Sequence, residues 1–177
     1  MSGSVDDPEG STPSASAPAD GSAGGTPAGA AATIAKADVF DPEGDGAPEN
    51  NPDVPLAYDG NPSTAWSTVT YRGSPAFGNL KAGVGLVLDL GTAQELAGVT
   101  LASTTPGATV EIRTAERPAA ELDGFALAAD GTVEDETEFA FEEPVNAQFV
   151  LVWITGLVDN GEGFNAGIAE ITVQTAG

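Results

Sequence analysis

The stretch Ala57–Trp66 reads Ala-Tyr-Asp-Gly-Asn-Pro-Ser-Thr-Ala-Trp and combines turn-forming residues, oxygen-bearing side chains and one large aromatic residue. Asp-Gly and Asn-Pro force a tight, non-helical path, because glycine tolerates positive φ and the residue before proline is disfavoured in the α region. The oxygens of Asp59 and Thr64, together with backbone carbonyls freed by the turn, are suited to a hard cation. A turn capped by an Asx hydrogen bond is the alternative, and the spacing alone leaves both open. Trp66 is expected to re-enter the core.

The composition favours a single domain built from short strands. The chain has 177 residues, of which 41% are hydrophobic, with 23 Gly and 13 Pro and a second half rich in Thr and Val. This mixture is typical of many strands joined by turns. The sequence as written contains neither an apolar run of about 18 residues nor a basic segment followed by an apolar one, so we expect no membrane span or signal peptide in it.

The residue types that are missing exclude several kinds of chemistry. The chain has no Cys and no His, which excludes disulfides, thiolate or imidazole metal sites, and Ser-His-Asp triads. Its 27 acidic and 5 basic residues give a formal net charge of −22. Such a surface repels nucleic acid and anionic lipid, whereas divalent cations and uncharged or cationic ligands remain possible partners.

The N-terminal segment, residues 1–32, consists mostly of Ser, Ala, Gly, Pro and Asp. It has too few large apolar residues to form a core, so we predict a disordered linker followed by a folded domain over residues 33–177. A tether of this kind indicates a larger segment upstream, for which a membrane span is one candidate.

The rest of the chain alternates between strand-like and turn-like stretches. Even spacing of short strands favours an all-β sandwich or barrel. Gln148–Ile154 is apolar on both faces, which predicts a central strand covered on both sides, with Trp153 in the core. The expected strands cover residues 33–40, 67–71, 84–91, 96–103, 109–115, 125–128, 132–141, 149–157 and 168–175.

An acidic, turn-rich loop over residues 41–53 interrupts this pattern. Its length is unusual for a compact domain, and such loops are commonly functional or disordered. Its spacing does not match an EF-hand, because Pro42 and Glu43 break the order of the ligands. A separate metal site and a solvated loop both remain open for this segment.

Three segments resemble the discoidin or coagulation factor 5/8 type C group of galactose-binding-like domains, which includes family 32 carbohydrate-binding modules. They are Ala57–Trp66, the strand end Val87–Gly91 and the closing Ala169–Val173. Their order and separation cover nearly all of the expected folded part. The resemblance implies a jelly-roll β-sandwich.

Two further segments, Val39–Gly46 and Phe77–Leu86, are similar to the extracytoplasmic C-terminal domains of actinobacterial lipid II flippase-like proteins and of some membrane-anchored kinases. Those domains follow a membrane span and a Pro/Ser/Gly-rich linker. The similarity implies an extracytoplasmic, membrane-tethered domain at the cell wall.

The discoidin resemblance also implies a structural calcium where the first turn meets the last strand. Such a site would join segments far apart in sequence, which benefits a sandwich without disulfides. The implied ligands are the side chains of Asp59, Thr64 and Glu170 and the carbonyls of Leu56, Asn61 and Ala169.

The resemblance supports a sugar-binding site less fully than it supports the fold. Carbohydrate-binding relatives usually use a His in this site, and this chain has none. An aromatic face beside a planar donor is what a sugar needs. The candidates are Tyr71, Arg72, Phe77, Phe164 and Asn165, and each has packing of its own loop as the alternative role.

Two functions follow from these expectations. The first is a non-catalytic module that binds a cell-wall glycan or related carbohydrate and is stabilised by calcium. The alternative is a regulatory ectodomain that binds another protein and has no sugar site. A glycosidase requires a pair of carboxylates at a defined separation; no motif singles out such a pair, so we expect no enzyme.

Overall fold

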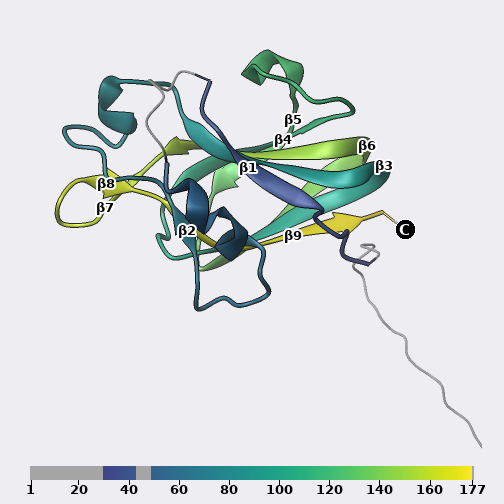
Figure 1. Cartoon of the computed structure of the whole chain (residues 1–177), viewed down its shortest axis with the longest axis horizontal. Coiled ribbons are helices and arrows are strands. Elements are labelled where there is room, and N and C mark those ends of the chain that lie inside the picture. The colour runs from purple at the N-terminus through teal and green to yellow at the C-terminus, as the bar shows by residue number, and fades with distance from the viewer. Residues whose placement is uncertain (1–29, 43–48, 177) are drawn as a thin grey trace, which may run out of the picture.

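The computed structural model describes residues 30–42 and 49–176, and its regular structure is almost entirely strand (Figure 1). The all-β fold is therefore confirmed. No helix in these ranges is long and apolar enough to cross a membrane. The strands are β1 (Lys36–Phe40), β2 (Trp66–Ser67), β3 (Val84–Ser103), β4 (Thr109–Ala115), β5 (Ala126–Thr132), β6 (Glu136–Gly156), β7 (Val158–Asp159), β8 (Phe164–Asn165) and β9 (Gly167–Thr175). Short 3-10 helices lie in the loops: η2 (Asn51–Ala57), η3 (Phe77–Asn79) and η4 (Leu122–Gly124).

Two long strands, β3 and β6, build both layers of the sandwich. The first half of β3 pairs with the second half of β6, from Val84↔Ile154 onward, and the second half of β3 pairs with the first half of β6, as far as Ala102↔Glu136. Register shifts on β3 after Asp89 and Leu96 mark the corner between the layers. The strand order is β2-β9-β3-β6-β4-β5, with β1 also on β3.

The pattern of the sequence led us to expect two separate strands in place of each of these long ones. This expectation was wrong, because the backbone stays extended and paired through the corner. Asp89 helps to hold that corner: its carboxylate accepts hydrogen bonds from Gly91 N (2.8 Å) and Gln148 Nε2 (2.9 Å). Gly91 has a φ of 87°, which favours glycine. The bond from Gln148, followed by that from Gly91, lowers the pKa of Asp89.

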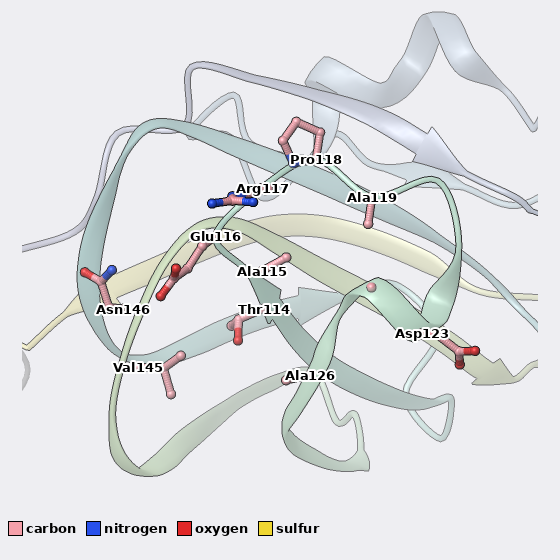
Figure 2. A pocket seen from close by; sticks show the side chains of 11 residues that line it. Thr114, Ala115, Glu116, Arg117, Pro118, Ala119, Asp123, Ala126, Val145 and Asn146 are labelled. Atoms are coloured by element: carbon pink, nitrogen blue, oxygen red, sulfur yellow. The ribbon is translucent and has the colours of Figure 1, made fainter.

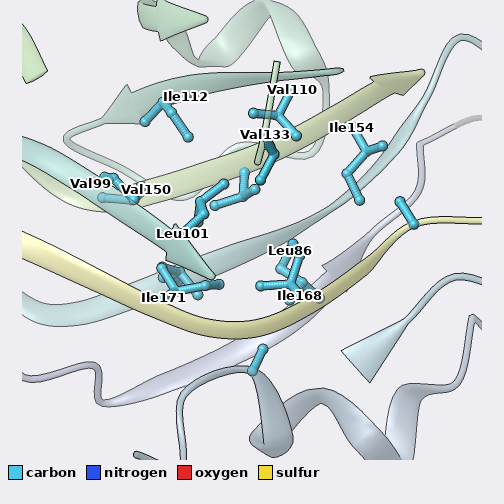
Figure 3. Close-up of a cluster of buried hydrophobic side chains, with 14 of the residues drawn as sticks. Leu86, Val99, Leu101, Val110, Ile112, Val133, Val150, Ile154, Ile168 and Ile171 are labelled. Atoms are coloured by element: carbon cyan, nitrogen blue, oxygen red, sulfur yellow. The ribbon is translucent and has the colours of Figure 1, made fainter. Parts of the chain in front are cut away.

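The main core fills the space between the two layers (Figure 3). On β6, Val150, Val152 and Ile154 point into it, and side chains from β3, β4 and β9 meet them. Trp66 is fully buried in the same cluster, as the sequence predicts. Its indole Nε1 donates to the carbonyl of Glu49 (2.7 Å), which satisfies the polar atom of this side chain.

A second, smaller core covers the outer face of the first layer. Phe149, Leu151 and Trp153 alternate with the inward residues of β6 and are nevertheless buried. The ring of Phe40 packs edge-on against Trp153 (5.8 Å between centroids) and Phe125 (5.2 Å). The loop over residues 116–125 closes over this face. The prediction of a central strand covered on both sides is therefore confirmed.

The N-terminal boundary of the ordered structure differs from the expected one. The sequence predicts a linker that includes Ala30–Ala32, but Ala32 N donates to the carbonyl of Val173 (2.7 Å) and Thr175 N donates to the carbonyl of Ala30 (3.1 Å). Folded structure thus includes Ala30. The rest of the expected linker, residues 1–29, lies outside the described residues, as do residues 43–48 of the acidic loop.

The two ends of the sandwich differ in character. We call one the loop end: it carries the loops over residues 70–83 and 104–108 and the β7–β8 hairpin, at the left of Figure 1. The other, the corner end, carries the turns of β3 and β6, the loop over residues 116–125 and residues 30–32.

Candidate ligand and metal sites

Two of the predicted sugar contacts are core residues. Phe77 is fully buried and Tyr71 is 7% exposed, and their rings pack edge-on with centroids 5.2 Å apart. Neither ring has a face free for a ligand, so both are withdrawn from the predicted contacts. Phe77, Gly78 and Asn79 have φ values of 59°, 63° and 62°. Such a left-handed run persists when the surroundings impose it, and the buried ring of Phe77 anchors it here.

Tyr71 belongs to a buried polar network that holds the loop end together. Its hydroxyl donates to Glu49 Oε2, and Val69 N donates to the other carboxylate oxygen of Glu49 (3.1 Å). Lys81 Nζ lies 3.4 Å from Glu49 Oε2 and 2.7 Å from Asp41 Oδ2. These charges are nearly inaccessible, with the Lys81 and Glu49 side chains 10% and 4% exposed. The network joins Asp41 and Glu49 of the acidic loop to the loop over residues 70–83.

The network shifts two pKa values upward. Burial, followed by the hydrogen bond to Glu49, raises the pKa of Tyr71 to about 12. Burial alone would lower the pKa of Lys81, but the bond to Asp41 and the neighbouring negative charge outweigh it and raise that pKa. Asp41 and Glu49 belong to the acidic loop over residues 41–53, for which the sequence leaves a separate metal site open. In the structure both carboxylates pair with Lys81, while residues 43–48 of the loop lie outside the described residues.

The remaining predicted sugar contacts at the loop end differ in exposure: Arg72 is exposed, whereas Phe164 and Asn165 are half-buried. Arg72 is exposed and makes no ion pair or hydrogen bond with any described residue. Phe164 is half-buried on β8, where its backbone exchanges two 2.7 Å hydrogen bonds with Tyr71. Asn165 Oδ1 is buried without a partner among the described residues. Leu80, which the sequence analysis did not single out, is 76% exposed on the same loop as Arg72.

The Ala57–Trp66 turn meets the last strand as the resemblance implied. Gly60 N donates to both carboxylate oxygens of Glu170, at 3.0 and 3.2 Å. Asp59 accepts from Asn61 N (2.9 Å) and from the hydroxyl of Thr64 (2.5 Å). The bond from Asn61 is the Asx bond of the alternative interpretation. The Thr64 bond, followed by the Asn61 bond, lowers the pKa of Asp59.

The donor set of this turn fits a hard cation. Burial, opposed in part by the Gly60 bond, raises the pKa of Glu170, and the charge of Asp59 adds to the rise. Two carboxylates thus converge with no cationic side chain between them among the described residues. A register shift between Ala102 and Ser103 makes Ala169 the extra residue of a bulge beside Glu170. Since the described residues hold no cluster of three acidic side chains, a cation here would need carbonyl oxygens as well.

Comparison with known proteins supports the fold. No protein-family model matches the chain. The CBM32 module of AlyQ, solved in complex with 4,5-unsaturated mannuronic acid, is 19% identical with a TM-score of 0.57, over 82% of this chain and 98% of that one. CpGH89CBM32-6 from Clostridium perfringens is 14% identical with a TM-score of 0.56, over 79% and 92%.

A third similar structure is chitosan-binding module 2 of a Paenibacillus sp. IK-5 chitosanase/glucanase, in complex with chitotriose. It is 20% identical with a TM-score of 0.55, over 78% of this chain and 94% of that one. At these identities the likeness shows the fold alone, an all-β jelly-roll sandwich.

The Glu49 network generates a prediction about stability. Tyr71→Phe should lower the free energy of unfolding by about 1–3 kcal/mol, because a buried carboxylate loses a donor. Tyr58→Phe is the matched control, since the Tyr58 hydroxyl makes no hydrogen bond with a described residue. Equal urea midpoints for the two variants would contradict a stabilising role of the hydrogen bond from Tyr71 to Glu49.

The same network should respond to alkaline pH. The folded-state pKa of Tyr71 lies above its ordinary value of 10.0, at about 12. Its contribution to stability is therefore complete below pH 10 and is lost as the pH rises from about 10 to about 12. Urea unfolding measured between pH 10 and 12 should show that the free energy of unfolding falls more steeply with pH for the native chain than for Tyr71→Phe.

Proposed function

We propose that this chain is a non-catalytic carbohydrate-binding module that binds its ligand at the loop end. The observation that carries the proposal is the fold match, which extends over 98% of a module solved with a bound uronic acid and 94% of one solved with chitotriose. Some similar structures are enzyme chains of which the matched part is a minor share, 34% in AlyQ with its alginate lyase domain. Binding is therefore a better proposal for this chain than catalysis.

The proposed contacts are Arg72, Phe164 and Asn165. Arg72 offers a planar set of donors that no described residue uses, and the half-buried ring of Phe164 offers an apolar edge. The carbonyl oxygen of Asn165 is buried without a partner among the described residues, so the side-chain amide would have to turn outward to accept from a hydroxyl group. The Glu49 network and the Phe77 anchor fix the loops that carry these groups, which reduces the entropy that binding would cost.

A protein partner is the second candidate, and Leu80 is the observation that favours it. A leucine that is 76% exposed beside Arg72 provides an apolar contact that a sugar needs less than a protein does. In that case the domain would be a regulatory ectodomain without a sugar site.

We also propose an extracytoplasmic, membrane-tethered location, as the flippase-like resemblance implies. The first described residues, Ala30–Ala32, run beside β9 at the corner end. The loop end thus points away from the side at which the preceding segment joins, so a tethered domain would present it outward, toward cell-wall glycan.

The sugar proposal is tested on an array of neutral, amino and uronic oligosaccharides, followed by calorimetry with the strongest hit. Arg72→Gln and Phe164→Ala should each weaken binding by about tenfold or more, the loss expected for a charged hydrogen bond or a buried ring contact. Lys36→Gln removes an exposed charge at the corner end and should bind normally. An array without any signal would reject the sugar site and favour the protein partner.

We further propose that the Asp59–Glu170 turn holds a structural calcium. Asp59, Thr64 and Glu170 would provide side-chain oxygens, and Leu56, Asn61 and Ala169 would provide carbonyls. Calcium accepts six to eight such ligands. When bound, it would neutralise the two converging carboxylates and connect the first turn to β9.

This proposal predicts that the order of the native and Glu170→Gln melting temperatures depends on calcium: the native domain melts higher with calcium, but not in chelator. With free calcium at about 100 times its Kd, the native domain should gain about 2.7 kcal/mol, or roughly 5–10 °C in Tm. Glu170→Gln should lose most of that gain. In chelator, however, Glu170→Gln should equal or exceed the native Tm at neutral pH, because Glu170 with its raised pKa destabilises the folded state above that pKa.

Glu162→Gln serves as the control, since this exposed acid lies outside the turn. It should follow the native chain in both conditions. A native Tm that calcium does not change would remove the metal proposal and leave the hydrogen-bonded turn as the complete account.

A further inference from the structure

A cleft of about 620 Å³, whose lining residues Figure 2 shows, lies at the corner end of the sandwich. It is formed where β4 ends, the loop over residues 116–125 begins and the corner of β6 passes. Its floor is made of small apolar side chains, among them Ala115, Ala126 and Val145. The volume falls in the range of small-ligand sites, and an apolar floor with a few polar groups is the usual form of such sites.

The polar side chains around the cleft have no partners within the domain. Thr114 is 4% exposed, yet its hydroxyl makes no hydrogen bond with any described residue and points into the cleft (Figure 2). Thr114 lines the cleft, and its hydroxyl is therefore available to a ligand without giving up a bond within the domain. Glu116, Arg117, Asp123 and Asn146 likewise form no side-chain hydrogen bond or ion pair in the described parts of the chain.

Arg117 has no ion pair with a described residue, unlike most of the basic residues of the chain. Lys36, Lys81 and Arg113 each have a carboxylate within 4 Å. In a chain with 27 acidic residues, a guanidinium that pairs with none of the described ones is available for a ligand. Among the described basic residues, only Arg117 and Arg72 are in this state, and they lie at opposite ends of the sandwich.

We propose that this cleft is a second binding site, and that it takes an amino sugar unit with a free ammonium group. Glu116 would accept a hydrogen bond from the ammonium, and Asp123, which lies on the opposite side of the cleft (Figure 2), would accept from another polar hydrogen of the sugar. Arg117, Asn146 and Thr114 would donate to hydroxyl oxygens, and the apolar floor would lie under the sugar ring. The loop end and the cleft could then bind two segments of glycan independently.

The charge of the site argues for an amino sugar over an anionic one. Two carboxylates, Glu116 and Asp123, stand against one guanidinium, Arg117. The surrounding protein carries a formal net charge of −22. Both the local and the overall field repel a carboxylate-bearing sugar and attract an ammonium. The inference shares the carbohydrate class with the proposed function but uses none of the loop-end residues.

The test is a titration of the isotope-labelled domain, followed by amide NMR, with glucosamine trisaccharide and with its N-acetylated counterpart. We expect glucosamine trisaccharide to shift amides in residues 114–126 and 145–147, and the acetylated sugar to shift them at least about tenfold more weakly, since it lacks the ammonium. Asp123→Asn and Thr114→Val should weaken this response. Asp130→Asn, an exposed acid on β5 outside the cleft, should not.

The two proposed sites can fail separately in this experiment. Shifts confined to the loop end, or equal affinities for Asp123→Asn and Asp130→Asn, would overturn the cleft site and leave the loop-end proposal intact. Cleft shifts that persist in Arg72→Gln and Phe164→Ala would support the cleft independently of the loop end. Equal responses to the amino and acetylated sugars would reject the amino sugar assignment.

Discussion

The continuous antiparallel pairing of β3 with β6 is the constraint on which the rest of the structure depends. Because both strands pass through the corner, one ladder places its first part in one layer and its second part in the other. The inner face of each half then contributes to the main core, and the outer face of β6 requires cover of its own. The loop over residues 116–125 supplies that cover. The pairing of β3 with β6 therefore leads both to the main core between the layers and to the second core on the outer face.

The buried network around Glu49 gives the loop end its rigidity. A buried ion pair alone is weak support for stability, because desolvation offsets much of its attraction. Here the carboxylate of Glu49 also accepts from Tyr71 and Val69, and Lys81 spans Glu49 and Asp41, so most of the polar atoms are satisfied. The network thus holds the loop over residues 70–83, which carries Arg72, against the rest of the loop end.

The sequence predicted the parts of this structure that have a local signature. The strand at Thr109–Ala115 has the predicted bounds, and the two-sided burial of Gln148–Ile154 follows from its uninterrupted apolar run. The contact between the Asp59 turn and Glu170 was reached through the family resemblance, and the structure adds the Gly60 bond that makes it. These features depend on neighbours in sequence or on a shared motif.

The features that could not be predicted from the sequence depend on contacts between segments far apart in the chain. Glu49 and Lys81 look like ordinary solvated charges, because nothing near them in sequence reports a partner 32 residues away. Tyr71 and Phe77 looked like ligand contacts for the same reason, since aromatic residues in loops give no sign of which way they turn. The cleft beside Arg117 arises from three segments that meet only after β4 and β6 have paired.

The central claim is that a sugar binds at the loop end on preformed loops. A crystal structure of the domain with the strongest hit of the oligosaccharide array would test it most directly. The account predicts a sugar in contact with Arg72 and Phe164, with the backbone of residues 70–83 displaced by less than about 1 Å, as in other preorganised sites. A sugar bound on an outer sheet face, or a loop end that rearranges to admit it, would contradict the account.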